Sequence, residues 1–339
     1  MSITVGLDVG GAHLKVARFE GDELVAVRQF ASPLWKGFDR LGQALGAAMP
    51  LLTGAERVAI TMTGELSDLF ENRRRGVFVL TESLEKGFGP KAQFYLGPRG
   101  FGSAADARED PQAVSSMNYL ATAQVIGRQC RDGLLVDFGS TTVDIIPVCG
   151  GETPTPCGDF ERQASGALVY TGLTRTAVAS VTTTAPFKGK WVGLSREFLA
   201  TMADVRRVLG EDLEDIDVHA TADGRGKSQE ESTARLARMF GCDLEDGTQH
   251  DWIAAASYIR EAQLRSVSDG THIVLSERPL PNEAALIAAG IGAHEAEEIA
   301  RRLGRPFMTF GELLSLNGSL ARAATHHAAA VAVGHLLIA

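Results

Sequence analysis

The chain has 339 residues, of which 45% are hydrophobic and 22% are charged, a balance typical of a water-soluble globular protein. A formal net charge of −9 argues against a nucleic-acid-binding surface, although bound metal ions would offset that acidity at a site for an anionic ligand. The four cysteines form no Cys-x-x-Cys pair, no signal peptide is recognisable, and no uncharged apolar run reaches the ~18 residues of a membrane span, so a cytoplasmic protein is expected.

The first part of the chain is predicted to begin with strands and to continue with alternating helices and strands. Apolar and β-branched runs predict strands over 3–7, 14–19 and 23–31. The elements expected next are a helix over 38–49, a strand over 57–62, a helix over 66–88, a strand over 92–96 and a long helix over 110–129. Asp110-Pro111 supplies the start signals of this last helix.

The second part is predicted to repeat this order around an insertion. Strands are expected over 134–136, 143–148 and 271–275, and helices over 195–209, 230–240, 251–268, 293–303 and 319–337. The segment 283–290 fits either a helix or a strand before the break Gly290-Ile291-Gly292. The helices over 110–129 and 319–337 are rich in small residues, which indicates two α/β lobes hinged on them with a cleft between.

Two hairpins carry the chemistry. Asp8 closes the first strand and is followed by Gly10-Gly11, whereas Asp137 closes a later strand and is followed by Gly139-Ser140-Thr141. Glycine lets backbone N–H groups approach an anion closely, and an acid beside such a turn can hold the metal that neutralises the anion. The two hairpins lie about 130 residues apart, which indicates a duplicated half-domain that clamps phosphate.

These motifs resemble those of the actin, sugar-kinase and Hsp70 superfold. Residues 8–11 match its first phosphate loop, 137–144 its second, and 288–293, with Gly290 and Gly292, its adenosine loop. The resemblance implies an α/β, two-lobed actin-like ATPase (ribonuclease H-like) fold with duplicated βββαβα halves. The lobes would comprise residues 1–128 and 129–339, with a helical insertion at about 150–270 of the second lobe.

Within this superfold the whole chain is similar to the hydantoinase A/oxoprolinase family, and to its branch linked to tetrahydromethanopterin-dependent one-carbon transfer and methanofuran biosynthesis. The stretches that carry this narrower resemblance are LDVGGAHLKVA (7–17), TMTGELSDLFENRRRGV (61–77), LLVDFGSTTVDIIPV (134–148), SGALVYTGLTRTAVA (165–179) and HATADGRGKS (219–228). The phosphate loops are specific to the superfold alone.

The resemblance implies an alkyl transfer in which the phenol oxygen of a tyramine unit attacks a furanylmethyl carbon and diphosphate leaves. Mg²⁺, backbone N–H groups and cations would neutralise the diphosphate. The expected metal ligands are Asp8, Asp137 and Asp144, and the expected phosphate-binding residues are Gly10, Gly11, Lys15, Gly139, Ser140 and Thr141. Asp8 and Asp137, together with Glu65, form the expected catalytic set.

The phenol must lose a proton, which calls for a general base. Glu65 is the first candidate because it follows a strand end, where clefts form in open α/β sheets, and His13 and His219 compete with it. A polar loop is expected either to cover the substrate or merely to link two helices, and it carries Asp223, Arg225 and Lys227 as substrate-binding candidates. The run Arg73–Arg75 fits a carboxylate site or an exposed helix face.

Two other functions use the same residues. The first is an ATP-dependent small-molecule kinase or oxoprolinase-type enzyme, and the second is a non-enzymatic nucleotide-binding protein of the pathway. Gly290 and Gly292 lack the adjacent glycines usual for purine packing, which favours a diphosphate substrate over ATP. The expected partners are therefore a small diphosphate and a phenolic amine acceptor, with no nucleic acid or membrane partner. The protein is expected to be a monomer or a homo-oligomer, and to require Mg²⁺ but not ATP.

Overall fold

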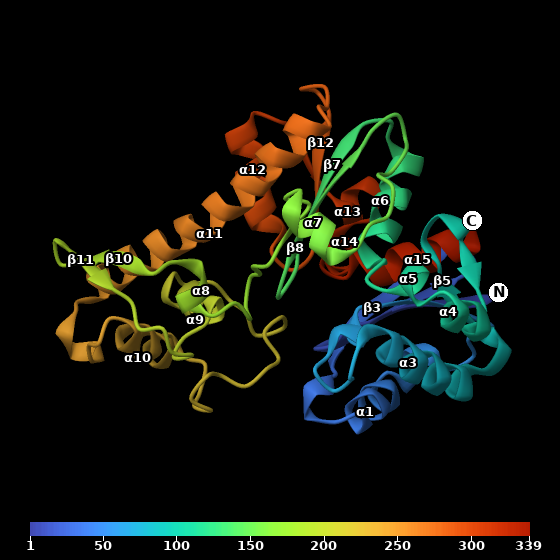
Figure 1. Cartoon of the computed structure of the whole chain (residues 1–339), viewed down its shortest axis with the longest axis horizontal. Coiled ribbons are helices and arrows are strands. Elements are labelled where there is room, and N and C mark those ends of the chain that lie inside the picture. Colours follow the sequence, from blue (N-terminus) through green and yellow to red (C-terminus); the bar gives the residue numbers. More distant parts are fainter.

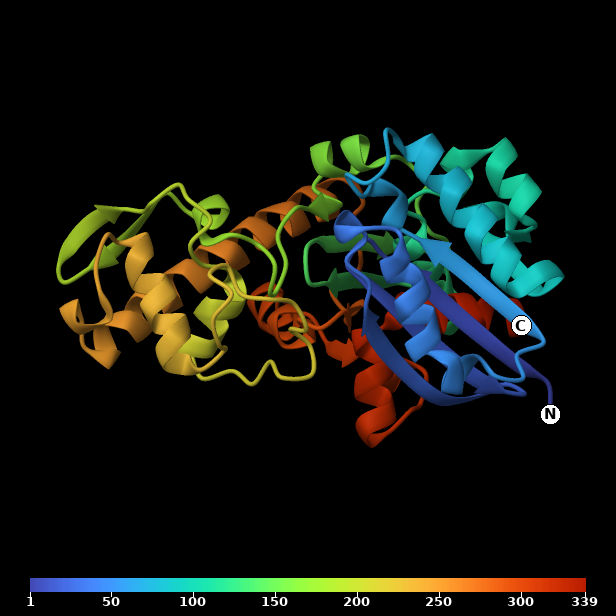
Figure 2. The same cartoon turned by 90° about the horizontal axis from the view of Figure 1, so that it is seen from below.

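A computed structural model describes residues 1–339 and places them in two α/β lobes, with a helical body extending from the second lobe (Figures 1 and 2). The first lobe is built on a six-stranded sheet of order β3-β2-β1-β4-β5-β6. Its strands are β1 (Ile3–Val9), β2 (His13–Glu20), β3 (Glu23–Ala31), β4 (Arg57–Met62), β5 (Ala92–Tyr95) and β6 (Phe101–Gly102). The strands β1 to β3 are antiparallel neighbours, whereas β4 and β5 run parallel to β1.

The second lobe repeats this topology. Its strands are β7 (Gly133–Phe138), β8 (Val143–Val148), β9 (Leu168–Val169), β12 (Ala285–Ala289) and β13 (Phe307–Thr309). In the order β9-β8-β7-β12-β13, the sheet again has three antiparallel strands followed by two parallel ones. Asp8 and Asp137 occupy the same next-to-last position of β1 and β7, so the predicted duplication is confirmed.

The helices of the first part differ from the prediction at two starts. They are α1 (Asp39–Ala47), α2 (Met49–Leu52), α3 (Arg73–Phe88), α4 (Ala104–Glu109), α5 (Pro111–Val114) and α6 (Asn118–Gln129). The helix predicted over 66–88 begins only at Arg73, because the Asn72 side chain caps it by accepting from the Arg75 N–H at 2.9 Å. The helix predicted over 110–129 is interrupted where Ser115 pairs with the end of β4 and Ser116 adopts a φ of 53°.

The second part contains the remaining elements and three further corrections. They are α7 (Asp159–Ala164), α8 (Val178–Val181), β10 (Thr184–Phe187), β11 (Lys190–Gly193), α9 (Met202–Val208), α10 (Gln229–Met239), α11 (Gln249–Glu277), α12 (Ala293–Leu303), α13 (Phe310–Leu313), α14 (Gly318–His326) and α15 (Ala328–Ile338). The strand predicted over 271–275 is wrong, because this β-branched run continues α11 with Thr271 and Val274 buried. The helix over 195–209 starts at Met202, and the last helix breaks at His327, whose φ of −127° is not helical.

The small-residue helices α6 and α15 lie between the two sheets. The helix α15 packs against β1, and the approach is so close that a Cβ on Gly6 would lie 2.0 Å from the carbonyl oxygen of Ala330. The helix α6 contacts α15 as well as β7 and β8. One buried core therefore joins side chains of both sheets, such as Phe19 and Leu135, through these helices. Although α15 follows the predicted boundary at residue 128, it packs on the first sheet.

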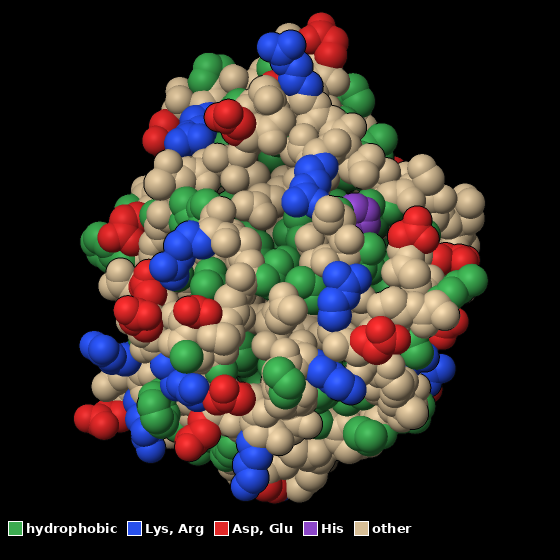
Figure 3. All heavy atoms as spheres, turned by 90° about the vertical axis from the view of Figure 1, so that its right-hand side faces the viewer, with side chains coloured by type: hydrophobic (Ala, Val, Ile, Leu, Met, Phe, Trp, Pro, Cys, Tyr) green, Lys and Arg blue, Asp and Glu red, His purple; other side chains and the backbone are tan.

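The helical body consists of α8, α9, α10, the β10–β11 hairpin and the first part of α11. It has its own core around Trp252, which stacks on Phe187 at a centroid distance of 4.5 Å. The 29-residue α11 is roughly 40 Å long and connects this body to the second sheet (Figure 1). No helix of the chain combines the length and the apolar character that a membrane crossing requires. On the face shown in Figure 3, acidic and basic side chains are interspersed.

Candidate active site

Both glycine turns open onto one cavity of about 560 Å³ between the lobes. The predicted site residues that line it are Gly10, Gly11, Lys15, Asp137, Gly139, Ser140, Thr141, Asp144 and Gly290. Those that do not line it are Asp8, Glu65, Gly292, Asp223, Arg225 and Lys227. The structure thus brings the two predicted phosphate turns together and separates the predicted substrate-binding loop from them.

The two turns have the same hydrogen-bonding geometry. The Gly10 N–H donates to the His13 carbonyl oxygen at 2.9 Å, and the Gly139 N–H donates to the Thr142 carbonyl oxygen at 2.9 Å. A Cβ would lie 2.9 Å from the accepting oxygen at Gly10 and 3.1 Å from it at Gly139. The first turn therefore requires glycine at this position, the second is tight for any other residue, and each leaves its following backbone open to the cavity.

A lysine pairs with the acid of the first turn and affects the acid of the second. The Lys15 ammonium is 2.8 Å from Asp8 Oδ2, and Asp8 itself is only 1% exposed. Burial opposes the charge of Lys15, but the Asp8 carboxylate raises the pKa of Lys15 above its usual value. Burial likewise raises the pKa of Asp137 to about 6, although Lys15 counteracts part of this rise. Lys15 therefore pairs directly with Asp8 and favours the charged form of Asp137 from a longer distance.

The acids differ in their fitness as ligands for the Mg²⁺ that the fold implies. Asp8 Oδ1 is buried without a hydrogen-bond partner. Burial and the charges of Lys15 and Asp8 account for the pKa of Asp137, and no hydrogen bond to its carboxylate does. Free carboxylate oxygens of this kind suit a hard divalent cation. Asp144, in contrast, forms an ion pair with Arg162, which also contacts Asp159. Asp137 therefore fits Mg²⁺ best, because it lines the cavity without an ion-pair partner. Asp8 does not line the cavity and pairs with Lys15 through Oδ2, so it retains only Oδ1 for a metal, and the predicted third ligand, Asp144, is held by Arg162.

Glu65 lies behind the cavity wall. Its side chain is 1% exposed, and it accepts a hydrogen bond from the hydroxyl of Ser116, a cavity-lining residue, at 3.1 Å. Burial raises the pKa of Glu65 to about 8, which keeps the carboxyl protonated at neutral pH. A protonated acid without access to the cavity does not favour the predicted role of Glu65 as general base.

The two competing histidines meet at the edge of the site. His13 lines the cavity, and its Nε2 lies 2.9 Å from Nε2 of His219, which comes from the loop between α9 and α10. Burial lowers the pKa of His13 to about 2 and that of His219 to about 4, so both rings are neutral at pH 7. Trp35 packs beside His219 at a centroid distance of 5.6 Å.

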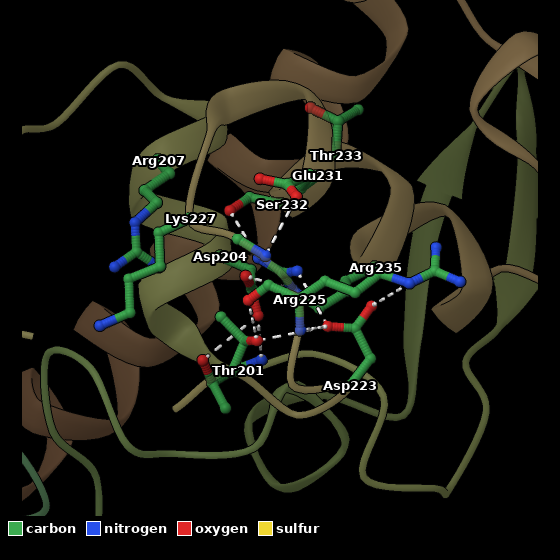
Figure 4. A network of polar contacts seen from close by, with 12 residues as sticks. Thr201, Asp204, Arg207, Asp223, Arg225, Lys227, Glu231, Ser232, Thr233 and Arg235 are labelled. Atoms are coloured by element: carbon green, nitrogen blue, oxygen red, sulfur yellow. Dashed lines mark hydrogen bonds and ion pairs between the residues drawn. The ribbon is translucent and has the colours of Figure 1, made fainter. Parts of the chain in front are cut away.

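The remaining loop residues are anchored to the helical body (Figure 4). The fully buried Arg235 of α10 contacts Asp204 at 2.8 Å and Asp223 at 3.1 Å. Lys227 pairs with Asp217 at 3.5 Å, and the Arg225 side chain is 68% exposed. The prediction that Asp223, Arg225 and Lys227 bind substrate is therefore not supported by their positions, and His219 is the loop residue that reaches the site.

Sequence reasoning missed Trp35 and Arg175, which also line the cavity. Arg175 is placed by Gly172, where a Cβ would lie 2.3 Å from the Thr141 nitrogen, so this segment lies directly on the second turn. A lone glycine three residues before an arginine is too weak a signal to reveal this. Gly290, with a φ of 79°, approaches Asp137, whereas Gly292 packs on the Phe138 ring and has a structural role.

Two lobes of repeated topology, with a glycine turn from each facing one cavity, define the class of two-lobed actin-like proteins. Within that class, the chain belongs to the hydantoinase/oxoprolinase family, whose family model matches residues 56–310. The family expected from the sequence is thus confirmed.

Two relatives and one solved structure illustrate these similarities. The chain is 33% identical over 242 residues, 71% of its length and 72% of the relative's, to the (4-{4-[2-(gamma-L-glutamylamino)ethyl]phenoxymethyl}furan-2-yl)methanamine synthase of Methanocaldococcus jannaschii. It is also 32% identical to the synthase of the same name from Methanococcus vannielii. This match extends over 123 residues, which are 36% of this chain and 54% of that protein. A nucleotide-free acetone carboxylase shares the fold with a TM-score of 0.50 at 13% identity, over 89% of this chain and 67% of that one.

Proposed function

We propose that the chain is a transferase that forms the aryl ether bond named in its relatives' product. It would join the phenol oxygen of a (glutamyl)tyramine to the methyl carbon of an aminomethylfuran-methyl diphosphate and release diphosphate, in methanofuran-type cofactor biosynthesis. The observation that carries this proposal is that both glycine turns and Lys15, the partner of Asp8, face one cavity in a chain 33% identical to this synthase.

The reaction places its main electrostatic demand on the leaving group. The phenol oxygen forms a bond to the furanylmethyl carbon while the bond from that carbon to diphosphate breaks, and the bonding electrons leave with diphosphate. Lys15 and the backbone N–H groups of the two turns stabilise the charge that develops there. When bound at Asp8 and Asp137, Mg²⁺ supplies further neutralisation of this charge.

His13 and its partner His219 orient the phenol. Both rings are neutral, and their Nε2 atoms share one hydrogen bond. With the His13 Nε2–H donating to His219 Nε2, the His13 Nδ1 is left to accept a hydrogen bond from the phenol hydroxyl. A histidine with such a low pKa is a weak base for a phenol whose own pKa is about 10. The proton therefore passes to an oxygen of the departing diphosphate, the strongest base that the reaction generates.

A reconstituted reaction tests the proposal. Purified protein is incubated with Mg²⁺, the aminomethylfuran-methyl diphosphate and γ-glutamyltyramine, and the ether and diphosphate are quantified by mass spectrometry and an enzymatic diphosphate assay. We expect equal amounts of both products, and a loss of at least about 100-fold in Asp137→Asn. Phosphate transfer from ATP without ether formation would instead support the kinase or oxoprolinase alternative. Tight nucleotide binding without turnover would support the non-enzymatic alternative.

A further inference from the structure

The cavity contains one cation without a counter-ion. Its lysine and arginine residues are Lys15, Arg162 and Arg175. Lys15 is paired with Asp8, and Arg162 is paired with Asp144. Arg175 has no carboxylate partner, and its guanidinium makes one side-chain hydrogen bond, to the Thr141 hydroxyl at 3.3 Å. Most of the five N–H donors of this side chain are therefore available to a ligand.

The backbone fixes Arg175 against the second glycine turn. The Arg175 N–H donates to the Ser140 carbonyl oxygen at 2.9 Å, and the Leu173 N–H donates to the Gly139 carbonyl oxygen at 2.9 Å. These bonds tie the segment 172–175 to the turn that is expected to hold phosphate. The guanidinium thus stands beside that turn because the main chain places it there, and not through a chance surface contact.

The same guanidinium reaches across the cleft to the first lobe. Its Cζ lies 4.6 Å from the centre of the Trp35 ring, within the range of a cation–π contact. Trp35 follows β3, and it is 41% exposed although it is a large hydrophobic side chain. A cation–π contact at a half-exposed ring is worth only ~0.5–1 kcal/mol, so an anion with several charged oxygens can displace it.

We propose that Arg175 is a diphosphate-binding residue that leaves the Trp35 ring to pair with the phosphate oxygens held at the second glycine turn. This inference rests on the proposed function for the identity of the anion. The position favours diphosphate over the glutamyl carboxylate, because Arg175 is tied to the Gly139–Thr141 turn, whose backbone suits phosphate. Arg175 then adds the charge that Lys15, already shared with Asp8 and Asp137, supplies only in part.

Binding of inorganic diphosphate, with Mg²⁺ present, tests the proposal without any turnover. Arg175→Gln removes the charge and keeps most of the side-chain volume, and Arg131→Gln is the matched control because its side chain is 86% exposed. By isothermal titration calorimetry, we expect Arg175→Gln to weaken binding about 10- to 100-fold, as for the loss of a charge-assisted hydrogen bond, and Arg131→Gln to bind as the wild type does. Unchanged melting temperatures show that both variants are folded.

Tryptophan fluorescence provides a second readout. We expect diphosphate to change the emission of the wild type and not that of Trp35→Phe, since Trp191 and Trp252 belong to the helical body. Binding of diphosphate by Arg175→Gln within twofold of the wild type, or an emission change that persists in Trp35→Phe, would overturn the proposal. If Arg175→Gln loses binding but the wild type forms no ether, the anion site stands and the proposed function fails.

Discussion

The Nε2 atoms of His13 and His219 lie 2.9 Å apart and join the first glycine turn to the loop of the helical body. Because 206 positions separate the two residues in sequence, this contact exists only when the lobe and the body meet. The Gln29 amide adds a second link by donating to the Asp215 carbonyl oxygen at 3.1 Å. Two uncharged imidazoles and one amide therefore link the loop of the helical body to the first lobe.

These histidines make stability depend on pH. An unfolded histidine gains a proton near pH 6.5, whereas folding lowers the pKa of His13 to about 2. The unfolded state therefore binds more protons below pH 6.5, and the free energy of unfolding falls as the pH drops from that value. His13 alone contributes a slope of up to about 1.4 kcal/mol per pH unit.

Urea unfolding at pH 7.5, 6.5 and 5.5 measures this slope. We expect a shallower slope for His13→Gln and for His219→Gln than for the wild type, and an unchanged one for His250→Gln, which alters an exposed residue. A wild-type slope in His13→Gln would show that its ring is protonated in the folded protein and would contradict the neutral pair.

Asp8 and Asp137 should respond differently to the same substitution. Asp8→Asn leaves Lys15 without its counter-ion. Because the Lys15 side chain is 29% exposed and water can partly solvate its charge, we expect a loss of about 1–3 kcal/mol, less than for a fully buried pair. Asp137→Asn replaces a desolvated carboxylate, whose pKa burial raises to about 6, and we expect unchanged or higher stability at pH 8. Chemical denaturation of both variants at pH 8 separates the two.

The double variant Asp8→Asn/Lys15→Met provides the control. Removing the unpaired charge as well as the carboxylate should restore part of the lost stability. If the double variant were as unstable as the sum of the single ones, the ion pair would not be the cause. Asp137→Asn is therefore the cleaner variant for activity measurements, because its fold is not at risk.

The sequence predicts the fold well where local chemistry determines it. The strands around Asp8 and Asp137 follow from apolar runs that end in an acid and a glycine turn, and their repetition indicates the two lobes. The prediction fails where tertiary contacts override local preference. The run at 271–275 has strand-forming residues, yet Thr271 and Val274 pack as one face of α11 against the second lobe.

The site is less predictable, because its members come together only across the cleft. Both glycine turns carry a local signature, and the structure places them at one cavity. Arg175 carries no such signature. Its importance comes from its contact with Trp35 of the other lobe and from the fact that no carboxylate pairs with it, and neither can be read from the local sequence. Glu65 shows the converse error: its place after a strand suggests a cleft, but Ser116 covers it.

Glu65 should reduce stability as the pH rises. Its pKa is about 4.5 when unfolded and about 8 when folded, so its contribution is fully present below pH 4.5 and is lost up to pH 8. Glu65→Gln keeps an acceptor for Ser116 and cannot ionise. We expect it to gain stability relative to the wild type by up to about 1.4 kcal/mol per pH unit over this range, and no further above pH 8.

Guanidinium unfolding between pH 5 and pH 9 provides the comparison, with Glu82→Gln on the exposed face of α3 as the matched control. The control should run parallel to the wild type throughout. A constant difference between Glu65→Gln and the wild type across this range would mean that Glu65 is ionised in the folded protein, and its role as a base would then regain support.

Gly6 tests the packing that positions the cavity. A Cβ there would lie 2.0 Å from the Ala330 carbonyl oxygen, so Gly6→Ala must push α15 away from β1, and we expect a loss of about 3 kcal/mol. Gly42→Ala in α1 meets open space and should instead gain about 0.5–1 kcal/mol. Because Ala328 and Ala329 at the start of α15 line the cavity, Gly6→Ala should also weaken diphosphate binding, whereas Gly42→Ala should not. Urea unfolding and calorimetry measure both effects, and wild-type values for Gly6→Ala would contradict the packing of α15 on the first sheet.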